Sequence, residues 1–184
     1  MFLKSRKAVA AATLSVMLPL SSVAMMPRSG IFAPQGVEFS MRSIDGERVS
    51  SDGLRGEVAV LAFGASWLPL SRTQLQGISK LADKYSARGV VVYWVSTESE
   101  SSKSKNYASD EQLRAFAKKY GLNVTVLRDP DGKISRLFKV DQVPAFVILN
   151  KDGNVVGAPI GGLDPEGKIE EQLERPLEEA LGKQ

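Results

Sequence analysis

The chain has 184 residues, of which 24 are Lys or Arg and 21 are Asp or Glu, and it contains neither cysteine nor histidine. Without cysteine, the protein has no disulfide, no thiolate nucleophile and no cysteine ligand for a metal. Without histidine, it lacks the usual general base near neutral pH and the commonest metal ligand. The composition therefore excludes most thiol, zinc and serine–histidine chemistry.

The positive charge of the chain is confined to its N-terminus. Lys4, Arg6 and Lys7 lie within the first 24 residues, which contain no acid, and the remaining residues hold 21 basic and 21 acidic side chains. A nucleic-acid-binding protein normally carries a basic field over its folded domain. We therefore expect no nucleic acid among the partners of this protein.

Residues 1–24 have the pattern of a secretory signal peptide. Three basic residues precede an apolar run from Ala8 to Leu20, and small residues end the segment at Ala24. The alternative is a retained membrane anchor, because the run approaches the length of about 20 residues that spans a bilayer. Pro19 and several hydroxyl residues interrupt it, so we expect cleavage and membrane attachment only if the segment is retained. Either outcome places the domain outside the cytoplasm, in a bacterial periplasm.

Residues 25–36 are predicted to be a flexible lead-in, and residues 37–184 are predicted to be one globular domain. Residues 37–50 alternate around Asp45-Gly46, which favours a hairpin with a type I′ turn. Continuous apolar runs predict further strands at 58–63, 90–95, 124–127, 145–149 and 154–156. The last two strands are expected to form a hairpin, because a Lys-Asp-Gly turn lies between them.

Four segments have apolar residues at the three- and four-residue spacing of an amphipathic helix. The first begins at Pro69, which suits a first helical turn because its missing N–H would have no partner there. The second covers 110–120, with Ser109 and Gln112 as a capping box, and a short third helix covers 134–138. Asp164-Pro165 is expected to cap the last helix, which Pro176 should kink or split. Strands that alternate with helices predict a three-layer α/β domain.

Three separated motifs resemble those of the TlpA-like thioredoxin-fold proteins, which belong to the thiol-disulfide oxidoreductase and redoxin superfamily. Residues 44–56 (IDGERVSSDGLRG) resemble the D-G-x-x-x-x-L-x-x-L-x-G lead-in of that family. Residues 63–72 (FGASWLPLSR) follow a predicted buried strand and resemble the F-W-A-S-W-C-P-P-C-R active-site segment of that family. Residues 143–149 (VPAFVIL) resemble its V-P-T-x-F-x-I segment, in which the proline is cis and faces the active site. The resemblance implies a thioredoxin-like three-layer sandwich, with a central mixed sheet, helices on both faces and an N-terminal hairpin extension.

The chain departs from this family at both reactive positions. Leu68 and Ser71 stand where the family has the two cysteines of its C-x-x-C motif. Leu68 cannot ionise or attack, and Ser71 has no histidine to activate its hydroxyl. We interpret Ser71 as a helix-start residue whose oxygen accepts a hydrogen bond from a backbone N–H. The absence of cysteine excludes thiol–disulfide oxidoreductase and thiol peroxidase activity, and we expect no catalytic residue at these two positions.

The scaffold that the resemblance implies can still bind a partner. In thioredoxin-like proteins a groove lies between the active-site loop and the segment before the cis-proline. By resemblance, the backbone of Val143, next to Pro144, would pair with an extended peptide. Trp67, Leu68 and Pro69 would form the apolar floor of that groove. The alternative is that Trp67 and Leu68 only pack against neighbouring loops, as aromatic and leucine side chains usually do.

No other residues form a recognisable catalytic or metal-binding set. Asp129 and Asp131 begin a D-x-D-G stretch, but a lysine and a valine occupy later ligand positions of the calcium-loop pattern, so a solvated turn is expected. Glu98 and Glu100 lie in a Ser/Lys-rich segment and are expected to face solvent. We therefore expect no metal and no cofactor.

Three functions from different classes fit this sequence. The leading hypothesis is a non-catalytic, exported domain that binds a protein or an extended peptide, as a chaperone-like or assembly factor of the cell envelope. The second is a structural subunit of a larger envelope complex, with the Ser-rich loop or the C-terminal helix as its contact surface. The third is an enzyme whose chemistry depends on a bound cofactor, a metal or residues supplied by a partner.

Overall fold

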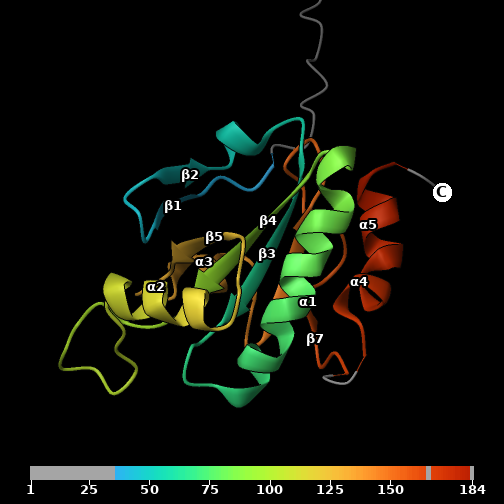
Figure 1. Cartoon of the computed structure of the whole chain (residues 1–184). Helices are drawn as coiled ribbons and strands as arrows, with labels where there is room; N and C mark the ends of the chain where they lie inside the picture. Colours follow the sequence, from blue (N-terminus) through green and yellow to red (C-terminus); the bar gives the residue numbers. More distant parts are fainter. Residues whose placement is uncertain (1–35, 165–166, 183–184) are drawn as a thin grey trace, which may run out of the picture. The chain divides into compact units, whose positions relative to one another are not determined.

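The computed structural model describes residues 36–164 and 167–182, which form a mixed sheet covered by helices (Figure 1). The signal peptide predicted over 1–24, and all but the last residue of the lead-in predicted over 25–36, lie outside the described residues. That last residue, Gly36, is buried against the backbone of Asp152 and Gly153. Within the described ranges, every helix is too short or too polar to span a bilayer.

Seven strands form one sheet in the order β2-β1-β5-β4-β3-β6-β7. Within it, β3 pairs parallel with β4 and antiparallel with β6, and β4 pairs parallel with β5. All seven residues of β3 are buried, as expected of a strand covered on both faces. The bounds of the strands are β1 Ser40–Ser43, β2 Arg48–Ser50, β3 Val58–Gly64, β4 Val90–Ser96, β5 Thr125–Arg128, β6 Ala145–Leu149 and β7 Ile160–Gly161.

Helices cover both faces of the sheet, which confirms the predicted three-layer α/β fold. Side chains from α1, α2, α4 and α5 pack on one face, and the end of α3 packs on the other. In Figure 1, α1 lies beside α4. Successive residues of β3 alternate between these two clusters, as the pleat of a strand requires. The helices are α1 Pro69–Tyr85, α2 Asp110–Lys119, α3 Lys133–Leu137, α4 Ile169–Gln172 and α5 Glu174–Ala180, with 3-10 turns at Asp52–Leu54 and Ser86–Arg88.

The starts of the two long helices follow the predicted capping chemistry. Helix α1 begins at Pro69, as expected for a residue without an N–H. At α2 the capping box is present: the Ser109 hydroxyl accepts a hydrogen bond from the Gln112 N–H at 3.1 Å, and the Gln112 side chain accepts one from the Ser109 N–H at 2.8 Å. Local sequence therefore determines where both helices begin.

The C-terminal helix is split at Leu173, as the sequence predicts. Pro176 has no N–H to donate to the carbonyl of Gln172 one turn earlier, so α4 ends there and α5 follows. The expected cap at Asp164-Pro165 is wrong, because the N-cap residue is Lys168. The side chain of Gln172 instead bonds both the N–H and the carbonyl of Asp164, which holds residue 164 in a loop before the helix.

The N-terminal hairpin is present, but its turn differs from the prediction. Strands β1 and β2 pair antiparallel, with Arg42 opposite Arg48. A type I′ turn requires positive φ at both central residues, whereas Gly46 has a φ of 91° and Asp45 does not have positive φ. The hydroxyl of Ser43 accepts hydrogen bonds from the N–H groups of Asp45 and Glu47, at 3.2 and 3.1 Å, and so stabilises a wider turn.

The strand predicted over 154–156 is shorter than expected. It is reduced to an isolated bridge between Leu149 and Val155. Gly157 then has a φ of 72°, which interrupts the extended backbone. The segment that pairs with the rest of β6 is β7, where Gly161 lies opposite Ala145. The hairpin that closes the sheet therefore has a longer connection than the sequence predicts.

Candidate functional site

The loop between β3 and α1 depends on a close approach between Gly64 and Ser71. Ser71 is 1% exposed, and its hydroxyl accepts a hydrogen bond from the Ala65 N–H at 3.3 Å, as expected for a helix-start residue. A Cβ atom at Gly64 would lie 3.0 Å from that hydroxyl oxygen and 2.9 Å from the indole nitrogen of Trp94. The end of β3 therefore requires glycine, and the Ser71 hydroxyl is occupied in holding the loop.

Leu68 lies at the N-terminus of α1 and stays outside the core. Its backbone is extended (φ −81°, ψ 119°), its side chain is half-buried, and it belongs to neither hydrophobic cluster of the described residues. Trp67 beside it is 55% exposed, and Pro69 is also exposed. Three consecutive apolar residues thus lie where a partner can contact them.

Two side chains fix this loop from its outer side. The indole nitrogen of Trp67 donates a hydrogen bond to the side-chain oxygen of Asn106 at 2.6 Å, and Asn106 donates to the Thr97 carbonyl at 3.0 Å. Arg72 donates to the carbonyls of Ser66 and Trp67, at 2.8 and 3.1 Å. Trp67 therefore contacts a neighbouring loop through its polar edge, while most of its ring remains exposed.

Glu98 is buried beneath the loop, so the expectation that it faces solvent is wrong. It is 1% exposed, and one carboxylate oxygen accepts a hydrogen bond from the Ser66 hydroxyl at 2.5 Å while the other accepts one from the Ser96 hydroxyl at 2.9 Å. A carboxylate tolerates burial when its oxygens accept hydrogen bonds. These bonds tie the loop to the end of β4. Glu100, in contrast, is exposed as expected.

An ion-pair network holds the start of α2 against β1 and β5. Arg42 lies 2.7 Å from Asp110 and 2.5 Å from Glu100. The hydrogen bond from Arg42 lowers the pKa of Asp110 below its ordinary value, although partial burial acts in the opposite direction. Arg128 is buried beneath this network and donates to the Ala108 carbonyl at 2.9 Å. The segment that follows Glu98 is therefore anchored at both of its ends.

The Val143–Pro144 peptide bond is cis, as the family resemblance implies. Pro144 is buried, whereas Val143 is half-buried, and no described residue forms a hydrogen bond with the N–H or the C=O of Val143. Both groups are free to pair with an added chain. A pocket of about 450 Å³ lies beside them, lined by Lys139, Val140, Asp141, Gln142, Ala145, Ala158, Pro159 and Gly161.

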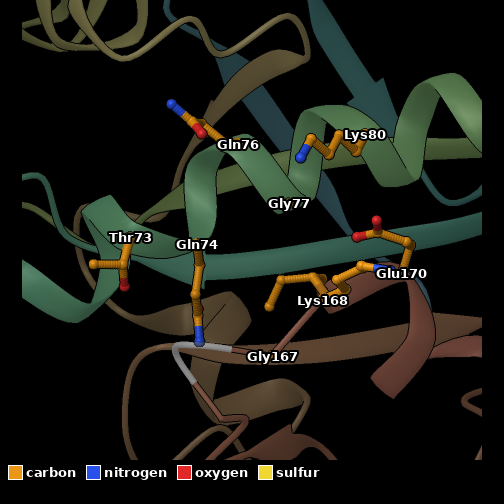
Figure 2. Close-up of a pocket in the computed structure, with 9 residues that line it drawn as sticks. Thr73, Gln74, Gln76, Gly77, Lys80, Gly167, Lys168 and Glu170 are labelled. Atoms are coloured by element: carbon orange, nitrogen blue, oxygen red, sulfur yellow. The ribbon is translucent and has the colours of Figure 1, made fainter.

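A smaller pocket lies between α1 and the segment that leads into α4 (Figure 2). Its volume is about 190 Å³. Gln74 is only 3% exposed, and its amide points from α1 toward the segment at Gly167. Gly77 allows α1 to approach this segment, because a Cβ atom there would clash with the side chain of Ile169. None of the site residues that the sequence predicts lines this pocket.

The D-x-D-G stretch is a helix start, and the expectation of a fully solvated turn is wrong for Asp129. Asp129 is 1% exposed, and its carboxylate accepts hydrogen bonds from the N–H groups of Ile134 and Ser135, at 2.9 and 2.8 Å. Asp131 is exposed and pairs with Lys133 at 2.6 Å. In the part of the chain that the structure describes, no group of three or more acidic residues could hold a metal ion.

Two of the side chains that shape the loop carry a positional signal in the sequence. Glu98 follows the predicted strand over 90–95, and Ser66 follows the predicted strand over 58–63. Parallel strands end at the same edge of a sheet, so residues just beyond them come close together. The contact of Asn106 with Trp67 has no comparable signal, because it depends on the path of a long loop.

Comparison with known proteins agrees with this geometry. The AhpC/TSA family model matches residues 33–158. The thioredoxin-like protein YneN of Bacillus subtilis is 28% identical over 140 residues, which cover 76% of this chain and 77% of that protein. The soluble secreted antigen MPT53 of Mycobacterium tuberculosis is 28% identical over 145 residues, which cover 79% and 76% of the two chains. The thiol-disulfide oxidoreductase ResA of Bacillus anthracis is 26% identical over 136 residues, covering 74% and 70%.

Solved structures show the same fold. A secreted disulfide oxidoreductase of Mycobacterium tuberculosis, homologous to Escherichia coli DsbE, is 26% identical with a TM-score of 0.59, covering 79% of this chain and 98% of that one. A thioredoxin family thiol:disulfide interchange protein of Chlorobium tepidum has a TM-score of 0.63 at 20% identity, covering 80% and 96%. These similarities agree with the thioredoxin-like sheet and helices described above.

Proposed function

The chain belongs to the AhpC/TSA family but contains no cysteine, and we propose that it is an exported domain that binds a protein partner without redox chemistry. It takes an extended segment of that partner into the groove between the Trp67–Pro69 loop and Val143. Its role is that of an assembly factor or a chaperone-like protein in the cell envelope.

The free backbone of Val143 is the observation that carries this proposal. Its N–H and C=O have no hydrogen-bond partner among the described residues, and they lie immediately before a cis-proline at the entrance to β6. An extended peptide that pairs with both groups adds a strand-like segment, and its side chains then reach the neighbouring pocket. Affinity from backbone pairing does not require a reactive group at Leu68 or Ser71.

The side chain at position 68 favours binding over turnover. Burying a leucine that is partly exposed contributes up to about 1.5–3 kcal/mol. A thiolate at a helix N-terminus, by contrast, is stabilised by the dipole and attacks disulfides. Leu68 and the exposed ring of Trp67 provide an apolar contact that releases its partner unchanged.

Export is supported by the N-terminal sequence and by the relatives. Residues 1–24 have a basic start, an apolar run and a small-residue end, which is the pattern of a signal peptide. The name of MPT53 describes that relative as secreted, and the structural relative from Mycobacterium tuberculosis is also described as secreted. The proposed location of this domain is therefore the periplasm.

In-cell photo-crosslinking tests the proposed function. A photoreactive residue placed at Leu68 should capture one dominant protein, which mass spectrometry identifies. Capture should be lost after Trp67→Ala and after a charge is introduced beside the probe, while the far-ultraviolet circular dichroism spectrum stays unchanged. Leu137 provides a matched control position, because it is an exposed leucine (45%) on α3, on the other face of the sheet.

The result at Leu137 separates the proposal from its alternative. If both positions capture the same proteins in the same amounts, or if Leu68 captures none from a well-exported protein, the groove is not the binding site. A structural subunit that uses another surface would then explain the retention of the fold.

A further inference from the structure

The start of α1 and the segment that contacts Trp67 hold three cations without an acidic partner among the described residues. Within those residues, Arg72 donates only to the carbonyls of Ser66 and Trp67. Lys103 and Lys105 lie in the segment that contacts Trp67 through Asn106, and neither takes part in an ion pair among the described residues. We call the half-buried side chain of Leu68 and the exposed side chains of Trp67, Arg72, Lys103 and Lys105 the Trp67 surface.

The carboxylates nearest in sequence do not neutralise this surface. Residues 65–73 and 101–107 contain three cations and no acid. Glu98 is buried, with both oxygens bonded to serine hydroxyls, and Glu100 is paired with Arg42. Residues 25–184 as a whole hold equal numbers of acids and bases, so a local excess of three positive charges is a specific feature of these two segments.

The proposed second wall of the groove, beside Val143, is electrically balanced. The pocket beside Val143 is lined by one cation, Lys139, and one acid, Asp141. Selection by charge would therefore come from the Trp67 surface, while the backbone of Val143 binds any extended chain. A partner complementary to both walls has main-chain groups, apolar side chains and carboxylates.

Resting on the proposed function, we infer that the Trp67 surface selects an acidic peptide segment. Its backbone pairs with Val143, an apolar side chain covers Leu68, and neighbouring Asp or Glu side chains face Arg72 and the two lysines. An anionic membrane surface or a nucleic acid offers the same charge, but neither offers the peptide N–H and C=O groups that can pair with the C=O and N–H of Val143.

Fluorescence anisotropy with two labelled peptides tests this selectivity on the purified full chain. One peptide alternates glutamate with valine and leucine, and the second replaces every glutamate by glutamine. We expect the glutamate peptide to bind about tenfold more tightly at low ionic strength, and the difference to disappear in molar salt, because exposed charges are then screened.

Three variants connect the selectivity to these residues. The double change Lys103→Gln with Lys105→Gln should remove most of the preference without altering the affinity of the glutamine peptide. Arg72→Lys keeps the charge but loses the planar guanidinium that bonds two carbonyls. It should keep the preference for the glutamate peptide while lowering the affinity for both peptides. Lys118→Gln with Lys151→Gln removes two exposed lysines elsewhere and should change neither affinity.

Each outcome decides a different claim. Equal binding of the two peptides, or a preference that survives the Lys103 and Lys105 changes, overturns the acidic selectivity and leaves groove binding intact. Failure of both peptides to bind at millimolar concentration overturns the selectivity together with the proposed function. Binding to phosphatidylglycerol vesicles or to an oligonucleotide, with no peptide preference, would identify an anionic surface as the ligand instead.

Discussion

The hydroxyl of Ser66 donates a hydrogen bond of 2.5 Å to the carboxylate of Glu98, which lies 32 residues further along the chain. This bond joins the loop that starts α1 to the segment that follows β4. Because Glu98 is almost completely buried, the position of the Trp67 surface depends on an acid that is itself inaccessible to a partner.

Removing the carboxylate of Glu98 should destabilise the protein. Glu98→Ala leaves the Ser66 and Ser96 hydroxyls without their acceptor and opens a cavity, so we expect the free energy of unfolding to fall by about 2–3 kcal/mol. Glu98→Gln keeps one acceptor oxygen and should cost less. Urea denaturation measures both. Glu57→Ala, at an exposed acid, is the control, and an equal loss in the two alanine variants would contradict the role of Glu98.

A methyl group at Gly64 should disturb the same loop from within the sheet. In Gly64→Ala the new Cβ lies 2.9 Å from the Trp94 indole and 3.0 Å from the Ser71 hydroxyl. We therefore expect overpacking to lower the free energy of unfolding by about 1–3 kcal/mol. Gly53→Ala is the matched control, because its nearest neighbour would be 3.6 Å away and its φ is not positive. Thermal unfolding followed by circular dichroism compares the two, and similar melting temperatures would refute the predicted clash.

Cysteines placed at positions 68 and 71 should form a disulfide. Leu68 and Ser71 are three residues apart at the start of α1, where side chains at this spacing lie next to each other. The double change Leu68→Cys with Ser71→Cys should therefore form an internal disulfide and give at least weak insulin reduction. Thiol titration and mass spectrometry under oxidising conditions detect the bond. A folded variant that keeps two free thiols would show that the loop geometry differs from that of redox-active relatives.

The pairing of Asp110 with Arg42 should make stability depend on pH in acid. The pKa of Asp110 is lowered in the folded protein, so its contribution to stability is present above its unfolded pKa and is lost as pH falls through the folded value. We expect Asp110→Asn to cost about 0.5–1 kcal/mol at neutral pH, since the pair is partly exposed, and progressively less below about pH 4. The midpoints of urea denaturation at several pH values measure the difference in stability between Asp110→Asn and the unmodified protein.

Asp141→Asn is the control for that series, because Asp141 is exposed and takes part in no ion pair among the described residues. Its difference from the unmodified protein should stay small at every pH. If the stability difference between Asp110→Asn and the unmodified protein persists unchanged in acid, the variant acts through helix capping or packing and not through charge.

The elements around the site were predictable because their signals are local. Pro69 marks the start of α1, and Ser109 with Gln112 marks the start of α2 within a few residues of chain. The apolar runs that became β3, β4 and β6 are continuous, as buried strands require. Each of these features depends on neighbours in sequence, so a single chain is sufficient to identify it.

The buried acids could not be predicted in the same way. Glu98 and Asp129 lie among polar residues, and their burial depends on contacts that form only in the folded protein: Ser66 for the first, and the first turn of α3 for the second. The position of β7 likewise depends on Gly157, whose positive φ ends the extended backbone after Val155. The polar sequence around Glu98 and Asp129 predicts that both side chains are exposed, although both are buried in the folded protein.

The close approach at Gly64 gives positions 68 and 71 unequal mutational freedom. Ser71 fills a space bounded by the Gly64 backbone, so only a side chain about as small as serine or cysteine fits there without displacing β3. Leu68 is half-buried and belongs to neither hydrophobic cluster of the described residues, so it is less tightly constrained. Under the proposed function, the apolar contact with a partner can therefore vary through substitutions at position 68, while the residue at position 71 preserves the architecture of the loop.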